Sequence, residues 1–367
     1  MLYIDNWNET QQRFINWWNN SNTGSPLMWI VSEREEPIEP LEAEIEFPDA
    51  EHFHTDVEEK SKRYRNFCRS HQFHAEAFPN FDLNIGAGSI AVYLGSEPKF
   101  RQDTIWFKKC MKGELDEQPP LQFDPNNMWF QKHLTLMERA RELAQDCYLV
   151  NIPDLVENID ILSAMRGPME MCYDLLDYPD ETKAYINQID DMYFKYYDPF
   201  YDRIKAEDGS STYTAFNIWG PGKIAKIQCD FSALMNPAQF RIFIQESLRK
   251  QAKQLNHTVY HLDGPDAIKH LDALLEIDEI QAIQWTSGAG KEDGISEVWM
   301  EPIYDKVCAA GKSLLIYAED GDVHRWIERI DMLVQRYTSK GLYIQFPDIM
   351  SAADAKLLLE TAKKRWS

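Results

Sequence analysis

The sequence predicts an α/β protein, a (β/α)₈ TIM-type barrel with an N-terminal helical extension. From about residue 80 onward, short apolar, β-branched or aromatic runs alternate with longer segments of helical periodicity. This alternation is typical of βαβ units and a parallel sheet. Eight runs can be distinguished, which suggests that the sheet closes into a barrel. A length of 367 residues also suits one barrel with insertions.

Residues 1–80 are predicted to form a cap that packs on the barrel of residues 81–367. The cap begins with a short amphipathic helix, QQRFINWWNN. The passage EREEPIEPLEAEIEFPD follows, and its prolines exclude one regular element. A polar helical run then continues through Phe67 and Cys68.

The barrel elements are predicted in chain order. The strands are LNIGAGSIAVYL, CYLVNIPD, TYTAFNIWG, KIQCDFSAL, HTVYHLDG, IQAIQWTSG, KSLLIYAED and GLYIQFPD. The helices between and after them are Pro179–Tyr197, Pro237–Leu255, Asp266–Leu275, Val298–Ala310, Val323–Tyr337 and Ala352–Arg365. Asn236 and Ser351 are good helix N-caps, and Gly311 and Gly341 follow helix ends.

The charge limits the kinds of partner. The formal net charge is -22, from 60 acidic and 38 basic residues. Nucleic acids and anionic membranes need phosphate neutralisation by Lys and Arg, so such a field repels both. Neutral or cationic small molecules are therefore the easier partners.

Compartment and redox chemistry follow from two further features. The chain opens without a basic segment before an apolar run, and no apolar stretch approaches the roughly 18 residues of a membrane span. The six cysteines are scattered without a CxxC pair, which argues against a disulfide framework and a thiolate zinc cluster. We expect a cytoplasmic protein.

Polar and aromatic residues gather where the predicted strands end. They are Asp154, Trp219, Asp230, His261, Asp263, Trp285, Glu319 and Asp348. Because the active sites of parallel barrels form at the carboxyl ends of the strands, we expect these residues at a functional mouth.

Several motifs carry a family resemblance. The main one runs from Tyr260-His261-Leu262-Asp263-Gly264-Pro265 to Thr286-Ser287-Gly288-Ala289-Gly290. Supporting motifs are Pro153-Asp154-Leu155, Gly167-Pro168, Trp219-Gly220-Pro221, Cys229-Asp230-Phe231-Ser232, Asn84-Ile85-Gly86-Ala87-Gly88 and Ala91-Val92-Tyr93-Leu94-Gly95. Over roughly residues 80–350 the chain resembles the uroporphyrinogen decarboxylase superfamily, especially its corrinoid-linked methyltransferase-like branch.

The resemblance implies a zinc site and a corrinoid partner. That branch binds zinc through a His-x-Cys on one strand and a later Cys, and the zinc activates a thiol or comparable nucleophile. Here His261-Leu262-Asp263 stands in place of His-x-Cys, and no cysteine follows Cys308. Residues i and i+2 of a strand share a face, so His261 and Asp263 could hold one ion, with Glu319 as a candidate third ligand. Such a site is more oxygen-rich than a thiolate site.

Other interpretations remain open at this point. Asp263 could cap the next helix while His261 bonds within the barrel. No DxHxxG corrinoid loop is present, so a corrinoid would be carried by a separate protein. Uroporphyrinogen decarboxylation would need an Arg-rich N-terminal segment and a catalytic aspartate, and neither can be matched securely.

Two further classes of function use the same mouth. Carboxylates beside Trp219 and Trp285 resemble a sugar site, which favours a glycosidase-like hydrolase as the alternative. A non-catalytic binding barrel is the third class.

The preferred prediction is a methyltransferase-like enzyme that acts on a small molecule. Predicted catalytic residues are Asp230, Asp263 and Glu319; predicted substrate-binding residues are Asp154, Trp219, Tyr260 and Trp285; predicted metal ligands are His261 and Asp263. The aromatic residues between Tyr193 and Tyr201 have near-helical spacing and are expected to pack on the barrel or on a second subunit of a homodimer.

Overall fold

The computed structural model describes residues 3–213 and 215–366. Its centre is a seven-stranded sheet in the order β2-β1-β13-β12-β11-β10-β9. The strands are β1 (Leu27–Glu33), β2 (His71–Ala75), β9 (Ile224–Gln228), β10 (His257–Asp263), β11 (Ala282–Thr286), β12 (Ser313–Tyr317) and β13 (Leu342–Gln345). Every neighbouring pair is parallel except β1 and β2, which run antiparallel. The protein therefore has the predicted α/β class, with a central parallel sheet compatible with a TIM-type fold.

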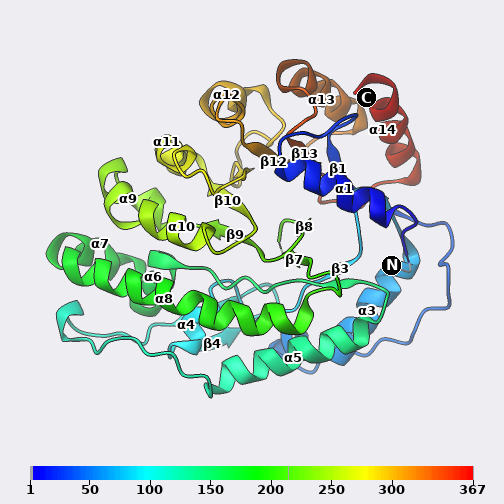
Figure 1. Cartoon of the computed structure of the whole chain (residues 1–367). Helices are drawn as coiled ribbons and strands as arrows, with labels where there is room; N and C mark the ends of the chain where they lie inside the picture. The colour runs from blue at the N-terminus through cyan, green and yellow to red at the C-terminus, as the bar shows by residue number, and fades with distance from the viewer. Residues whose placement is uncertain (1–2, 214, 367) are drawn as a thin grey trace.

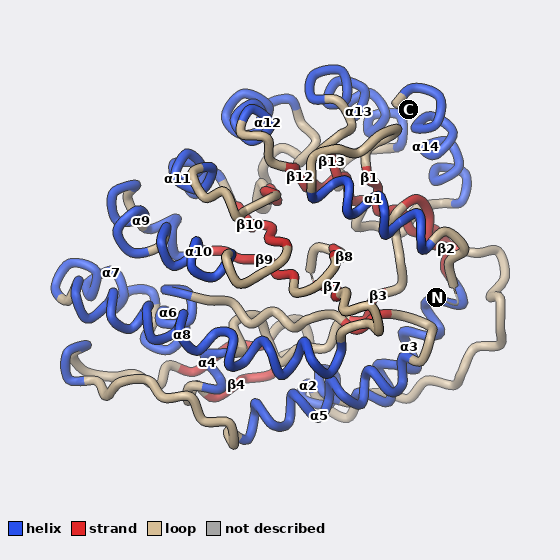
Figure 2. Tube along the Cα trace, in the orientation of Figure 1, coloured by secondary structure: helices blue, strands red, loops and turns tan. Residues whose placement is uncertain are grey.

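Six short strands accompany the long sheet. They are β3 (Asn80–Phe81), β4 (Glu97–Phe100), β5 (Ile105–Lys108), β6 (Leu149–Val150), β7 (Ser211–Tyr213) and β8 (Ile218–Gly220). β3 pairs with β6 in parallel, and Ile152 forms a parallel bridge to Tyr213. β7 also contacts β9, so the arc of strands continues from β9 through β7 and β6 to β3 (Figure 2).

Helices surround the strands (Figure 1). They are α1 (Trp7–Trp18), α2 (Ala50–Thr55), α3 (Val57–Ser70), α4 (Ile90–Tyr93), α5 (Met128–Ala144), α6 (Asn158–Arg166), α7 (Pro168–Asp177), α8 (Pro179–Ile204), α9 (Pro237–Phe243), α10 (Gln245–Ala252), α11 (Leu271–Leu275), α12 (Asp305–Ala309), α13 (Val323–Tyr337) and α14 (Ala352–Arg365). Shorter helical turns are η1 (Leu115–Glu117), η2 (Asp230–Leu234), η3 (Pro265–His270), η4 (Glu297–Trp299) and η5 (Met300–Tyr304). Within the described ranges, no helix combines the length and apolar character that crossing a bilayer requires.

Helix α1 covers the end of the sheet at which the strands begin. The Trp17 Nε1–H donates to the carbonyl oxygen of Gly341, just before β13 (2.9 Å). The Trp18 ring stacks on His257, the first residue of β10, with centroids 5.0 Å apart. Both tryptophans are buried. The helix thus closes the end of the sheet opposite to the expected functional mouth.

The N-terminal segment contributes more than a cap. β1 lies inside the long sheet, between β2 and β13, with Leu27 opposite Tyr343. The sequence prediction missed this strand because LMWIV is a continuous apolar run with no alternation. Such runs are typical of strands that are buried on both faces.

The predicted first barrel strand was placed wrongly. LNIGAGSIAVYL forms a loop and helix α4, and the strand is β3, which ends just before it. Gly86 and Gly88 have φ of 104° and 86°, a conformation that an extended strand excludes. A Cβ on Gly86 would also lie 2.9 Å from the Phe107 ring, so the loop packs against β5 too closely for a side chain.

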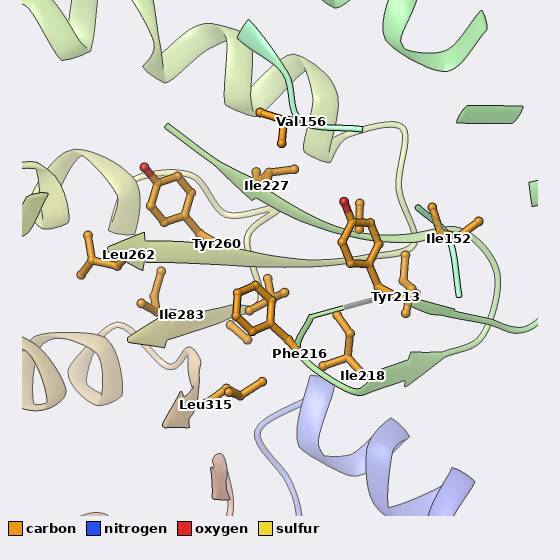
Figure 3. Close-up of a cluster of buried hydrophobic side chains, with 14 of the residues drawn as sticks. Ile152, Val156, Tyr213, Phe216, Ile218, Ile227, Tyr260, Leu262, Ile283 and Leu315 are labelled. Atoms are coloured by element: carbon orange, nitrogen blue, oxygen red, sulfur yellow. The ribbon is translucent and has the colours of Figure 1, made fainter. Parts of the chain in front are cut away.

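The core lies between the strands and the helices. Figure 3 shows one part of it, where Ile227, Tyr260, Leu262 and Ile283 from neighbouring strands lie near the β7–β8 hairpin. Tyr260 and Leu262 alternate with His261 and Asp263 along β10, so the two pairs point to opposite faces of the sheet. The apolar pair is buried, and the polar pair lies on the face where the Phe216 ring is 5.1 Å from that of His261; we call this face the inner face.

The buried Asp190 of α8 makes stability depend on pH. Burial raises the pKa of Asp190 to about 7. The Ser247 hydroxyl donates to the Asp190 Oδ1 (2.8 Å), and this hydrogen bond lowers the pKa but does not cancel the effect of burial. A carboxyl whose pKa is raised by folding binds more protons in the native state, so stability falls as the pH rises from about 4 to 7. Asp190→Asn keeps the acceptor for Ser247 and cannot ionise. We expect its free energy of unfolding to exceed that of the wild type at pH 8 by up to about 4 kcal/mol, and by much less at pH 4.

Urea unfolding at both pH values measures this difference. The control is Asp191→Asn, which changes an exposed carboxylate that pairs with Lys250. An Asp190→Asn curve that runs parallel to the wild-type curve across this pH range would contradict the prediction.

Candidate functional site

Strand alternation places a row of polar side chains on the inner face of the sheet. Lys226 and Gln228 lie two residues apart on β9, and Asp230 is the second residue after the strand. In the register, His261 of β10 is opposite both Gln228 and Gln284 of β11. These side chains therefore share one face near the carboxyl ends of their strands.

Three side chains converge at this end. One ligand atom each from Asp230, His261 and Asp263 all lie within 4.8 Å of one another. The two carboxylates are exposed and His261 is half-buried. One imidazole and two carboxylates in this arrangement suit a divalent cation that accepts nitrogen and oxygen ligands. The structure thus brings together both predicted metal ligands, His261 and Asp263, and two predicted catalytic carboxylates, Asp230 and Asp263.

Hydrogen bonds fix the orientation of two members of this group. The His261 Nδ1 bonds to the Gln284 Oε1, and the Gln284 amide in turn donates to the Thr286 Oγ1 (2.9 Å). An amide oxygen accepts only, so the proton resides on Nδ1 and the lone pair of Nε2 is left for a ligand. The Gln228 Nε2 donates to the Asp230 Oδ2 (2.9 Å).

Burial and the Lys226 charge favour the neutral form of His261. Burial, followed by the nearby Lys226 ammonium, lowers the pKa of His261. The surrounding protein partly desolvates the Asp230 carboxylate at the mouth and so raises its pKa, whereas His261 and Lys226 lower it. A neutral imidazole is the form that binds metals.

Asp160 of α6 holds the backbone of Asp230 in place. Its carboxylate accepts from the backbone N–H of Asp230 (2.8 Å) and of Phe231 (2.9 Å). Burial, together with repulsion from Asp230, raises the pKa of Asp160 to about 6. The charged form is the better acceptor, so these hydrogen bonds oppose the shift.

A buried ionic layer lies beneath the group. The Lys226 ammonium is 2.9 Å from the Asp154 carboxylate, which also accepts from the Tyr213 hydroxyl (3.1 Å). Glu157, at the start of α6, accepts from the backbone N–H of Gln228, and burial raises its pKa well above the ordinary value. Asp154 therefore acts as a counter-ion in the structure, whereas we predicted that it contacts substrate.

A cavity of about 590 Å³ opens beside the group. Asp160, Gln228 and Asp230 line its polar side. Its apolar side includes Trp106 and Phe107 of β5, and Trp106 is 64% exposed. The volume and the mixed lining suit a small molecule.

The two tryptophans that were predicted to bind substrate lie elsewhere. Trp219 is buried beside α1, with its ring 5.7 Å from that of Trp7. Trp285 is fully buried against Trp299, with centroids 4.9 Å apart. Trp285 is opposite Leu262 in the register and so points away from the inner face. Neither tryptophan lines the cavity.

Tyr260 and Glu319 also lie outside the converging group. Tyr260 is buried on the helix-facing side of β10, with its pKa raised well above the ordinary value, mainly by burial. The backbone N–H of Glu319 donates to the Asp293 Oδ1 (3.2 Å). Burial, followed by repulsion from Asp293, raises the pKa of Glu319. Glu319 is therefore not brought to the group as a third ligand.

Sequence reasoning missed Asp160, Lys226, Gln228 and Gln284. The last three could have been found from strand parity, since they stand two or four residues from Asp230 and two residues from Thr286. Asp160 left no such signal, because its partners are about 70 residues later in the chain.

Removal of the Asp160 carboxylate is expected to destabilise the loop that carries Asp230. Asp160→Ala leaves two backbone N–H groups without their acceptor, which costs about 1–3 kcal/mol of unfolding free energy. Asp160→Asn keeps one acceptor oxygen and should lose less. Urea unfolding measures both, with Ser163→Ala from the same cavity wall as the control. An Asp160→Ala variant as stable as Ser163→Ala would refute this role.

No protein-family model matches the chain, and no curated protein matches it by sequence. Among solved structures, a methyltransferase from Methanosarcina mazei is similar, with a TM-score of 0.62 and 11% sequence identity. The alignment covers 98% of this chain and 99% of the methyltransferase chain. At this identity the similarity concerns the fold, because one fold can carry many activities. The chain therefore shares the fold of a methyltransferase over nearly its whole length.

Proposed function

We propose that this protein is a methyltransferase-like enzyme that acts on a small molecule in the 590 Å³ cavity. Asp230, His261 and Asp263 would hold a divalent cation, with zinc as the first candidate. The observation that carries the proposal is the convergence of their ligand atoms within 4.8 Å beside this cavity. The proposal includes closure of the strands into one barrel of the uroporphyrinogen decarboxylase type.

The donor set fits a cation better than a purely structural role. Burial lowers the pKa of His261, which favours the neutral imidazole, and its Nδ1 is bonded to Gln284, as is usual for a histidine whose other nitrogen binds a metal. The two carboxylates would balance the charge of the ion. A bound zinc ion supplies a Lewis acid that activates a thiol or a comparable nucleophile.

The residues of the chain would divide the remaining tasks. Gln228 and Asp160 keep Asp230 in position through the hydrogen bonds described above. Trp106 and Phe107 form an apolar wall that excludes water from one side of a substrate. A corrinoid, if it delivers the methyl group, would be carried by a separate protein, since the chain lacks the DxHxxG loop.

The hydrolase alternative loses part of its support. It relied on tryptophan faces for sugar stacking, and both Trp219 and Trp285 are buried away from the cavity. Asp154 is likewise neutralised by Lys226. Asp230 and Asp263 remain as its carboxylates, so this function stays a second candidate if no metal binds.

Metal binding tests the centre directly. We expect the purified protein to bind about one zinc ion per chain, and His261→Ala, Asp263→Ala and Asp230→Ala each to weaken zinc binding at least about tenfold. Plasma mass spectrometry gives the metal content and isothermal titration calorimetry gives the affinity. Glu319→Ala is the matched control, because it removes a nearby mouth carboxylate that is outside the group. The absence of zinc binding by the wild type would exclude the metal centre and favour carboxylate chemistry.

Methyl transfer tests the activity itself. With methylcobalamin as donor and a small thiol as acceptor, the wild type loaded with zinc should accelerate the change in visible absorption that accompanies loss of the methyl group. His261→Ala should abolish the acceleration while its thermal unfolding stays close to that of the wild type. Equal rates with and without the protein would contradict methyl transfer from a corrinoid.

A further inference from the structure

A second cavity, of about 520 Å³, is lined by residues of helix α3, of strand β3 and of the loop that follows β6. It shares no lining residue with the cavity beside Asp230. Five aromatic side chains contribute to its wall: Phe47, Phe53, Tyr64, Phe67 and Phe81. Such a wall favours a flat apolar ligand, because aromatic rings pack well in offset or edge-to-face contact.

The cavity wall also carries charged groups, the cationic Lys60 and Arg63 and the anionic Asp82. The Lys60 ammonium lies 5.6 Å from the centre of the Phe53 ring and, among the described residues, forms no ion pair. Arg63 on the same helix differs, since its guanidinium is 3.1 Å from Glu59. Burial lowers the pKa of Lys60, and the charge of Asp82 opposes this effect. In a chain of net charge -22, an unpaired lysine at a cavity is a local attraction for an anion.

A buried acceptor at the same cavity lacks a donor. Asn151 lines the cavity and is 3% exposed. Its Oδ1 has no hydrogen-bond partner among the described residues. A buried carbonyl oxygen without a partner costs about 1–3 kcal/mol, so a ligand N–H or O–H there would be stabilising.

We propose that this second cavity binds a planar aromatic ligand that bears an anionic group. The ring lies among the phenylalanine side chains, the anion pairs with Lys60, and an N–H or O–H of the ligand donates to the Asn151 Oδ1. The site does not depend on the metal centre. It is nevertheless close to it, because Asn217 lines this cavity while the neighbouring Phe216 ring lies 5.1 Å from His261.

Two dyes that differ in one charged group test the proposal. The anionic probe is 1-anilinonaphthalene-8-sulfonate, and the neutral probe is N-phenyl-1-naphthylamine, which has the same rings without the sulfonate. Fluorescence titration gives the Kd of each. We expect Lys60→Met to raise the Kd of the anionic dye at least about tenfold and to leave that of the neutral dye within about threefold. Lys60→Arg should restore binding of the anionic dye.

Two further variants locate the site. Lys356→Met removes the same charge from an exposed position on α14 and should change neither Kd. Trp106→Ala alters the first cavity and should likewise leave both Kd values unchanged. The proposal is overturned if Lys60→Met binds the anionic dye as well as Lys356→Met does, or if Trp106→Ala is the variant that loses it.

A measurement on the wild type tests the proposal without relying on the folding of any variant. A crystal structure with the anionic dye should show its rings beside Phe53 and Phe67 and its sulfonate at Lys60. Dye density elsewhere, with this cavity empty, would also overturn the proposal. Neither result depends on zinc, so the outcome is separate from that of the metal and methyl-transfer experiments.

Discussion

The buried ion pair between Lys226 and Asp154 is the interaction on which the inner polar face depends. An ammonium with 2% of its side chain exposed is tolerated only where its charge is paired and bonded. Lys226 also bonds to Gln228, whose amide reaches Asp230, so one chain of polar contacts links the loop after β6 to the site. Removal of one partner of such a pair costs about 3–5 kcal/mol. The position of Asp230 therefore depends on two sets of contacts. One is the Lys226–Asp154 ion pair, which acts through Gln228, and the other is the pair of backbone N–H groups that donate to the Asp160 carboxylate.

The sequence could predict those parts of the molecule that depend on short-range periodicity. Helices α13 and α14 have the predicted bounds, and four predicted strands contain β10 to β13. The convergence of His261 and Asp263 follows from their i, i+2 spacing on one strand. The same parity argument would have excluded Trp285, which the register places opposite Leu262 on the other face. The prediction for Trp219 was wrong for another reason. TYTAFNIWG was predicted as one strand, whereas β7 and β8 are two short strands that pair antiparallel, and Trp219 lies beside Trp7 of α1.

Features that depend on contacts between distant parts of the chain could be predicted from the sequence only in part, or not at all. Nothing in the segment of α6 indicates that Asp160 accepts the backbone amides of η2. The burial of Lys226 runs against the usual exposure of lysine, and it becomes intelligible only beside Asp154. The metal role of the converging group and the identity of any ligand remain predictions, since a shared fold does not fix the chemistry of a site.

The pairing of β1 with β13 affects how the protein folds during its synthesis. Leu27 is opposite Tyr343, so a strand near the start of the chain has its parallel partner near the end. Ribosomes add roughly 5–20 residues per second, and β1 must therefore wait on the order of tens of seconds for β13. During that time its apolar residues and one unpaired strand edge are open to other chains. Protection by a chaperone during synthesis would matter more for this strand than for β10 to β12, whose partners emerge close behind them.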